Sequence, residues 1–475
     1  MTDHSSPGPV DEVAQGLAAF VCGLPREMDE ATERAARLVL LDSFAVALGA
    51  LSHPAAEAGR RYAALFPAAE GALVWGTTLR VSPEIATLVN GVPLRGYDYN
   101  DLYIGKGGGG HPSDIVPGVI AMAEWGAKSG REVLQALVVG YEVALHLFDT
   151  VAISKSACDY VNITGIAGTC AIGALMGLTQ DQLAEALSIT VTPHAASHEV
   201  ESSELNRRGD LTMWKRFNGS DAVRQSVYAC LLASVGVEGA VRAFTGKCGF
   251  MNSVNTDPGA TAKVLERLAL RDAPKRIAQT TFKRWPVGSR AQSAIQATLE
   301  ARAKIASPLM VDKLKVFTQE GVYEHLVRSR KDPWHPFSRE TADHSLPYVV
   351  TATLLDGKVR PESFDLPRVN DPALRRFLED RVTVEVEPAL DNATPGEFLS
   401  RVEFLLKSGA VVKGEARPAP GHPKQPFTEE EMVAKLEENA GALLGKSGTA
   451  NLVGAVQSLS EAKRVTDLVS CLAIS

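Results

Sequence analysis

The chain lacks cysteine pairs at the spacing of a metal-binding motif. Its six cysteines are scattered along the sequence and form no Cys-x-x-Cys pair. This spacing argues against both a zinc site and an iron–sulfur cluster. His194 and His198 stand four residues apart, as in a two-histidine metal face, but the sequence shows no third ligand beside them. We therefore predict no metal site.

The chain also lacks a long apolar run and a block of like charges. No stretch of about 18 apolar residues occurs, and the N-terminal MTDHSSPGPVDEV has no basic start followed by an apolar segment. The net charge is −7, without the runs of five or six like charges that mark nucleic-acid-binding arms. We expect a cytoplasmic protein that binds neither membrane nor nucleic acid.

Aromatic residues are few, at 6%, whereas apolar residues make up 45% and charged residues 22%. This composition, rich in alanine and leucine, is typical of a soluble and largely helical protein. The 475 residues are roughly three times the usual length of a domain. Two domains, or one large domain with a satellite, are expected.

Two periodicities divide the chain. From Val10 to about Leu270 apolar residues recur every three or four positions, as in EVAQGLAAFVCGL, and Thr179 is a suitable N-cap in LTQDQLAEAL. After Pro274, LMVDKLKVFT and RVTVEVEP alternate with period two, and SRVEFLLKSGAVVKGEA indicates two strands around Ser408-Gly409. Helical periodicity returns after RPAPGHPKQPF. We predict a mainly α protein, in which an all-helical domain (residues 1–271 plus 418–475) carries an inserted, smaller α+β domain (residues 272–417).

Polar residues gather at both ends of a glycine-rich loop. Asp98, Asn100 and Asp101 precede Gly107–Gly110, and His111 follows. A glycine run indicates tight bending or movement of the backbone. An imidazole and a carboxylate brought together by such a loop can share a proton-transfer task.

The same loop has a structural alternative. Ser113 or Asp114 would cap a helix starting at Ile115, and His111 would merely lie nearby.

Two cationic segments follow. ELNRRGDLTMWKRFNGSD, just ahead of a predicted helix, holds Arg207, Arg208, Lys215 and Arg216. Guanidinium groups bind carboxylates bidentately, so the cluster suits a ligand with several carboxylates; a solvated basic turn is the alternative.

TFKRWPVGSRAQSA holds Lys283, Arg284 and Arg290 near the predicted domain boundary, where clefts form. A positively charged linker is the alternative there. In HPFSRETADHSLPYV, Ser338 to Thr341 are expected to cap a helix, and His344 is interpreted as a core or interface histidine.

Five motifs, taken in order, resemble one family. DYNDLY with GHPSD, DLTMWK, FKRWPVGSRAQ, RETADHSLPYVV and PGHP are similar to the MmgE/PrpD family of 2-methylcitrate dehydratases, which includes cis-aconitate decarboxylases and iminodisuccinate epimerase. The resemblance implies a homodimer in which the α+β domain forms a lid over the helical domain. It also implies catalysis in the intervening cleft, without metal or organic cofactor, on a small acid with two or three carboxylates.

The resemblance carries over to individual positions. It implies catalytic roles for Asp101, His111, Lys215 and Lys283. Substrate binding is expected from a second set: Asp98, Asn100, Arg208 and Arg290. By the same resemblance, the decarboxylases have a histidine at the position of Asn162 and another at the position of Arg290. The dehydratases lack the first of these histidines but keep the second, so Arg290 departs from them as well.

Three functions stay open on the sequence. The first is a hydro-lyase of the 2-methylcitrate dehydratase type, with a place in propionate metabolism. The second is an epimerase or a decarboxylase of a related acid. The third is a non-catalytic carboxylate-binding protein, which would need cations but no acid–base pair.

Overall fold

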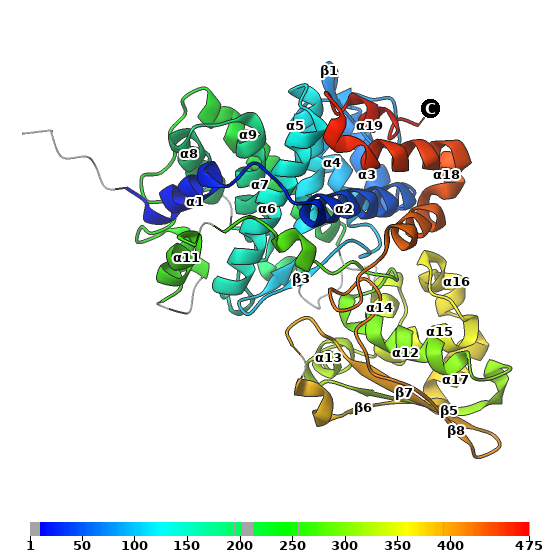
Figure 1. Ribbon diagram of the computed structural model, residues 1–475. Helices are drawn as coiled ribbons and strands as arrows, with labels where there is room; N and C mark the ends of the chain where they lie inside the picture. The colour runs from blue at the N-terminus through cyan, green and yellow to red at the C-terminus, as the bar shows by residue number, and fades with distance from the viewer. Residues whose placement is uncertain are drawn as a thin grey trace, which may run out of the picture.

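The computed structural model describes residues 10–193, 195–201, 212–254, 257, 259–270, 272–392 and 394–474. The described chain is mostly helical and carries a small mixed sheet in its C-terminal part, which confirms the predicted class in its coarse form. In Figure 1 the helical bulk lies above the sheet, and the last helices of the chain return to the helical part.

Thirteen of the helices that the structure describes make up the helical part. They are α1 (Glu12–Gly23), α2 (Glu30–Gly49), α3 (Pro54–Ala63), α4 (Pro83–Leu94), α5 (Val116–Trp125), α6 (Gly130–Thr150), α7 (Val161–Met176), α8 (Gln180–Val191), α9 (Trp214–Ser234), α10 (Phe250–Val254), α11 (Ala260–Leu268), α18 (Glu429–Gln457) and α19 (Thr466–Ser470). Thr179 caps α8 in a capping box with Gln182, which confirms the predicted N-cap. Helix α18 packs along α2, so the two ends of the chain meet.

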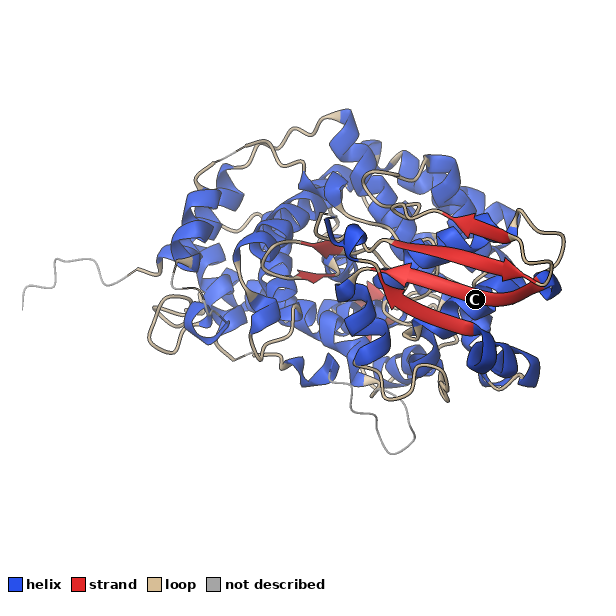
Figure 2. Ribbon diagram, turned by 90° about the horizontal axis from the view of Figure 1, so that it is seen from below, coloured by secondary structure: helices blue, strands red, loops and turns tan. Residues whose placement is uncertain are grey.

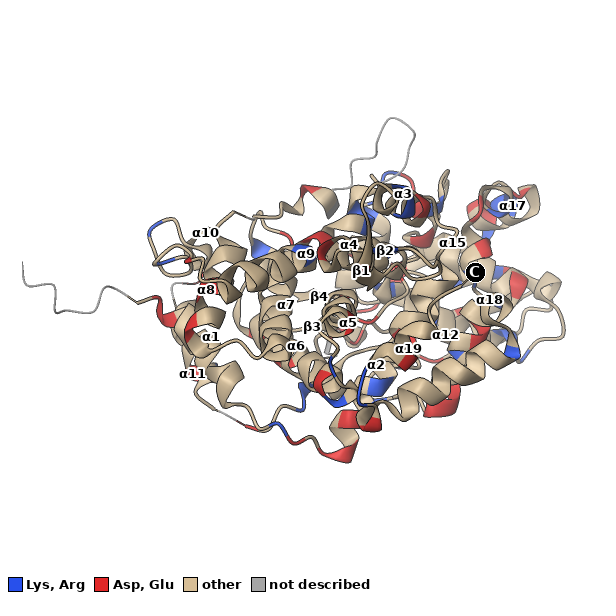
Figure 3. Cartoon of the chain, turned by 90° about the horizontal axis from the view of Figure 1, so that it is seen from above, with Lys and Arg blue, Asp and Glu red and all other residues tan. Residues whose placement is uncertain are grey.

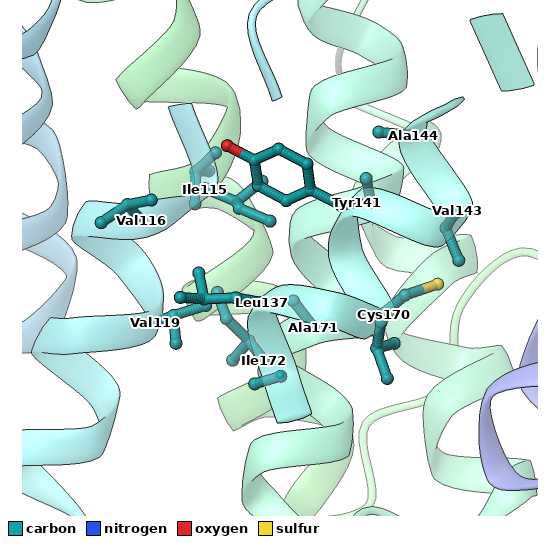
Figure 4. Close-up of a cluster of buried hydrophobic side chains, with 14 of the residues drawn as sticks. Ile115, Val116, Val119, Leu137, Tyr141, Val143, Ala144, Cys170, Ala171 and Ile172 are labelled. Carbon is teal, nitrogen blue, oxygen red and sulfur yellow. The ribbon is translucent and has the colours of Figure 1, made fainter. Parts of the chain in front are cut away.

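Apolar side chains of neighbouring helices build the main core. Figure 4 shows Val119 of α5, Leu137 of α6 and Ile172 of α7 in one cluster, and all three are fully buried. Burying each such side chain contributes about 1.5–3 kcal/mol. In Figure 3 charged residues lie mainly on the outer helices, while α7 at the centre carries none. The centre of the helical part is therefore apolar and closely packed.

Within the described ranges, α6 is the one helix that by itself is long and apolar enough to cross a membrane. Helices α2 and α3, which are joined at a sharp bend, meet the same criteria of length and composition when they are taken as a pair. Most residues of α6 are buried against other helices, as in the core of a folded domain. A core helix meets the same criteria of length and composition as a membrane span.

Two small antiparallel sheets interrupt the part of the chain predicted to be all-helical. They pair β1 (Pro67–Leu73) with β2 (Arg80–Val81), and β3 (Tyr103–Ile104) with β4 (Gly109–Gly110). Strands β2, β3 and β4 have two residues each and are too short to show period-two alternation, and the seven-residue β1, PAAEGAL, does not alternate between apolar and polar residues. The prediction of an all-helical first domain is corrected accordingly.

The C-terminal part is built on a four-stranded sheet in the order β6-β5-β7-β8. Its strands are β5 (Val311–Thr318), β6 (Val382–Val386), β7 (Ser400–Leu406) and β8 (Val411–Gly414). Strand β5 pairs parallel with β6, and the other pairs are antiparallel. The predicted strands are confirmed, and Gly409, with a φ of 86°, turns the chain between β7 and β8.

Helices cover one face of this sheet, and Figure 2 shows the other face turned toward the viewer. The helices in this part of the chain are α12 (Gln292–Arg302), α13 (Glu320–Tyr323), α14 (Arg339–Asp343), α15 (Leu346–Asp356), α16 (Leu366–Val369) and α17 (Pro372–Arg381). Leu314, Val316, Val402 and Phe404 alternate along β5 and β7 and are buried in a second apolar core.

The two cores use different parts of the chain. The first contains residues from Val13 to Phe282 and from Phe427 to Leu472, and the second contains residues from Trp285 to Ala419. The chain therefore passes from one core to the other twice. The exact domain boundaries at 271 and 417 stay predictions.

Candidate active site

A cavity of about 350 Å³ is lined by residues from both parts of the chain. Its charged and imidazole side chains are Arg95, Asp98, His111, His198, Lys215, Lys283, Arg290, His325 and His344. Four of these residues are arginines or lysines, and one, Asp98, is a carboxylate. Such a lining suits a small anion because a low-dielectric wall strengthens the field of the cations.

Asp98 is the centre of this cluster. Its Oδ1 lies 3.0 Å from Lys283 Nζ and 3.6 Å from Arg95 Nη1. Histidines face it on both oxygens: His111 Nε2 is 3.9 Å from Oδ1, and His344 Nε2 is 3.9 Å from Oδ2. Burial favours the neutral acid, but Lys283 and Arg95 outweigh it and hold the pKa of Asp98 well below its usual range. Asp98 is therefore a carboxylate.

His111 presents a free lone pair to the cavity. Its Nδ1 lies 2.5 Å from the backbone carbonyl oxygen of Asp101, which can only accept, so Nδ1 carries the proton. Burial, reinforced by Arg95 and Lys283, lowers the pKa of His111 well below its usual value. The ring is therefore neutral, and its Nε2 can accept a proton.

The carboxylate of Asp101 does not face His111. It accepts hydrogen bonds from the Ser113 amide at 3.1 Å, the Tyr141 hydroxyl at 2.6 Å and Thr280 Oγ1 at 3.0 Å. Burial raises the pKa of Asp101. The acid–base pair expected from the sequence is corrected in this respect: the carboxylate beside His111 is Asp98, and Asp101 orients the ring through its backbone carbonyl.

Asn100 and the residues after His111 also have internal partners. The Asn100 amide donates to Ser113 Oγ at 2.9 Å and accepts from Arg95 Nη1 at 3.0 Å, and the residue does not line the cavity. Neither Ser113 nor Asp114 caps a helix, because both lie inside the 3-10 turn Pro112–Ile115 that leads into α5. Asp114 instead accepts from the Tyr160 hydroxyl at 3.1 Å. Asn100 is thus placed to support the site rather than to touch a ligand.

The glycine run forms the β3–β4 hairpin that delivers His111. The chain bends tightly here, as the glycine run predicted, and it does so although none of the four glycines has a positive φ. The reason for glycine is space: a Cβ at Gly109 would lie 2.3 Å from Ile104 Cδ1, and one at Gly110 would lie 2.1 Å from Tyr160 Cδ2. The hairpin packs too closely for any side chain at these positions.

Lys215 and Arg216 lie in the first turn of α9, which begins at Trp214 rather than after the cationic segment. Lys215 is buried and lines the cavity. Arg216 binds both oxygens of Glu340, at 2.7 and 2.6 Å, and so joins α9 to α14. Arg207, Arg208 and His194 lie outside the described residues.

The segment after Thr281 supplies two cations. Lys283 Nζ donates to the Asp98 carbonyl oxygen at 2.6 Å, and its side chain is only 1% exposed. The guanidinium carbon of Arg290 lies 4.8 Å from the ring centroid of Phe398. Burial lowers the pKa of Arg290, and no carboxylate in the described ranges pairs with it. Arg284 instead binds Glu438 at 2.7 Å, away from the cavity.

Sequence reasoning missed several polar residues of the cavity, among them Arg95, Tyr160, His325 and His344. Arg95 and Tyr160 carry no motif signal, and His344 was interpreted as a core or interface histidine. His344 Nδ1 lies 2.5 Å from Asp343 Oδ1. His325, another lining residue, has its pKa lowered to about 2 by burial and by Arg290. The Asp-His pair inside RETADHSLPYVV was the one signal that could have pointed to His344.

Asn162 holds a neighbouring segment in place. Its side-chain amide donates to the carbonyl oxygens of Asp159 and Ala196 and accepts from the Ala196 amide at 3.1 Å. It does not line the cavity, but the segment it holds leads to His198, which does. Across the described residues, no group of three or more His, Cys, Asp or Glu side chains could hold a metal ion.

A cationic cavity and a neutral histidine beside a carboxylate would suit proton transfer on a small anion. Comparison with known proteins gives the family. The MmgE/PrpD N-terminal domain matches residues 15–263, and the MmgE/PrpD C-terminal domain matches residues 285–461. The chain belongs to the MmgE/PrpD family, as the motifs predicted.

Named relatives are similar over most of the chain. Cis-aconitate decarboxylase of Homo sapiens is 25% identical, covering 97% of this chain and 94% of that protein. The mitochondrial 2-methylcitrate dehydratase of Yarrowia lipolytica is 25% identical, covering 87% of this chain and 80% of that protein. The 2-methylcitrate dehydratase of Salmonella typhimurium is 24% identical, covering 74% and 73%. These relatives support the family without selecting one activity.

Proposed function

We propose that the protein is a lyase of the 2-methylcitrate dehydratase type, which removes water from a small di- or tricarboxylic acid without a cofactor. The observation that carries the proposal is the neutral His111, whose Nε2 faces a cavity lined by Lys215, Lys283 and Arg290. The relatives named 2-methylcitrate dehydratase support the same reaction class.

In the proposed reaction, His111 Nε2 takes the proton alpha to a substrate carboxylate. Negative charge then develops on that carboxylate, and the lysines stabilise it. Arg290 binds a second carboxylate, since no carboxylate in the described part of the chain neutralises it. Loss of the hydroxyl group leaves an alkene.

An epimerase is the second candidate. It is favoured by the second imidazole, His344, which faces Asp98 from the other part of the chain. An epimerase would use the same first step and return the proton to the opposite face of the carbon. Decarboxylation is less well supported, because the family resemblance places Asn162 and Arg290 where the decarboxylases have histidine. The Asn162 side chain is also engaged with the backbone of Ala196.

A proton-exchange experiment separates these functions. The purified protein is incubated in D2O with a panel of citrate-like and aspartate-like acids, and proton exchange and products are followed by NMR. Exchange with an alkene product supports the lyase, and exchange with inversion alone supports the epimerase. Absence of exchange with every acid would favour a carboxylate-binding protein. The homodimer and the cytoplasmic location stay predictions.

A further inference from the structure

His344 lies at a fixed corner between two helices. Helix α14 ends at Asp343, and Ser345 caps α15 by accepting from the Tyr348 amide at 3.1 Å. The Ser345 hydroxyl also donates to the Pro333 carbonyl oxygen at 2.5 Å. A capping box at Ser338 fixes the start of α14. The backbone on both sides of His344 is therefore held, so its imidazole has a defined direction.

The imidazole of His344 is oriented like that of a proton-transfer residue. Nδ1 lies 2.5 Å from Asp343 Oδ1, and Asp343 is 2% exposed. The ring therefore presents Nε2 to the cavity, 3.9 Å from Asp98 Oδ2. His111 presents its Nε2 to the other oxygen of the same carboxylate, also at 3.9 Å. Two histidines from different parts of the chain thus flank one anion.

The two histidines have different supports. The Nδ1 of His111 contacts a neutral backbone carbonyl group, and the cations Arg95 and Lys283 lie close by. These surroundings favour the neutral imidazole, which can act as a base. The Nδ1 of His344 rests on a carboxyl side chain, which compensates positive charge on the ring. A pair of titratable groups in contrasting surroundings is how sites separate the roles of acid and base.

We propose that His344 is the second proton-transfer residue of the site and protonates the leaving hydroxyl group, with Asp343 as its positioning residue. This inference rests on the proposed lyase function. His111 takes the alpha proton, the electrons of that C–H bond form the alkene, and the C–O bond breaks toward oxygen. His344 gives its Nε2 proton to that oxygen, so water leaves. Exchange with solvent through the open cavity then removes the proton from His111 and returns one to His344.

The test compares two leaving groups in His344→Gln. Fluoride departs without the full protonation that hydroxide needs. A substrate analogue with fluorine in place of the hydroxyl group therefore does not depend on His344 as the proton donor. We expect the variant to dehydrate the hydroxy acid about 100-fold or more slowly than the wild type, the usual scale of general acid catalysis. Fluoride release, followed with a fluoride electrode, should fall less than about 10-fold, since His111 still removes the alpha proton.

A matched control is His335→Gln. His335 also contacts a carboxylate, Asp332, at 2.9 Å, but its side chain is half exposed and outside the cavity. We expect both rates to equal those of the wild type. His344→Asn, checked by thermal unfolding, serves if the glutamine variant does not fold. Equal loss of both rates, or loss of neither, would overturn the assignment of His344. A wild type that exchanges no alpha proton with any acid would overturn the proposed function itself, and the role of His344 with it.

Discussion

Lys283 contacts Asp98 at two atoms. Its Nζ donates to the backbone carbonyl oxygen at 2.6 Å and lies 3.0 Å from Oδ1 of the carboxylate. Asp98 has a φ of 48°, in the left-handed region that costs most residues stability. The double contact with Lys283 compensates this strain. One lysine thus fixes both the backbone and the charge of the carboxylate between the two histidines.

Replacing Lys283 with methionine should damage both activity and stability. The variant leaves Asp98 as a buried carboxylate without its nearest cation, a change that typically costs about 3–5 kcal/mol of folding free energy. We also expect kcat/KM to fall by about 2–4 kcal/mol of transition-state stabilisation. Thermal unfolding and steady-state kinetics measure the two effects. An unchanged unfolding temperature would show that Asp98 is solvated rather than buried.

Lys215→Met provides the comparison. Lys215 lines the same cavity, but Lys283 and Arg95 are the cations that chiefly lower the pKa of Asp98, so the loss of Lys215 should act mainly on the substrate. We expect kcat/KM to fall by a similar amount, about 2–4 kcal/mol, with a smaller change in unfolding temperature than in Lys283→Met. Wild-type kinetics in this variant would remove Lys215 from the carboxylate-binding residues.

Replacing His111 with glutamine should separate binding from proton transfer. Glutamine is similar in volume and can hydrogen-bond to the Asp101 carbonyl group, but it cannot take a proton near neutral pH. We expect proton exchange in D2O to fall by about 10²–10⁴-fold, while calorimetric titration shows nearly unchanged binding of the acid. Wild-type exchange by this variant would make His111 a structural residue.

Sequence patterns predicted the larger elements because each spans several repeats of its own period. The alternation in LMVDKLKVFT predicted β5 (Val311–Thr318), and helical periodicity in GREVLQALVVGYEVALHLFD predicted α6. The two-residue strands β3 and β4 could not be predicted this way, because they contain a single repeat each. Their pairing depends on tertiary packing around Gly109 and Gly110, which local pattern does not encode.

The sequence predicted many of the residues that line the site, but not which of them contact one another. Asp98, His111, Lys215, Lys283 and Arg290 all line the cavity. The motifs could not show that Asp101 turns toward Tyr141 while Asp98 faces His111, since side-chain direction follows from packing of distant segments. His344 was missed for the same reason: its partner Asp98 lies almost 250 residues earlier in the chain.

The close packing of the hairpin predicts a large effect of one added methyl group. In Gly110→Ala the new Cβ would lie 2.1 Å from the Tyr160 ring, so the hairpin must shift. Because His111 follows directly, we expect activity to fall, with a loss of stability of about 1–3 kcal/mol. Gly321→Ala is the matched control, because no atom lies within 4 Å of its Cβ position. Kinetics and thermal unfolding of both variants check this; equal behaviour of the two would contradict the packing argument.

Asp114 should make stability depend on pH. Burial, together with the nearby Asp101, raises the pKa of Asp114 to about 7 despite Arg95. Because this value exceeds that of the unfolded chain, about 3.9, the folded state holds the proton more tightly. The resulting stabilisation is fully present below the unfolded value and is lost as the pH rises through about 7.

Asp114→Asn removes this titration while keeping the size of the side chain. We expect the variant to gain stability relative to the wild type as the pH rises from about 4 to 7, by an amount on the order of a few kcal/mol. Urea unfolding at several pH values in this range measures the difference. Asp181→Asn, at an exposed aspartate in the first turn of α8, is the control and should show no such trend. A difference between Asp114→Asn and the wild type that stays constant with pH would show that Asp114 is ionised throughout, and that the Arg95 guanidinium outweighs burial.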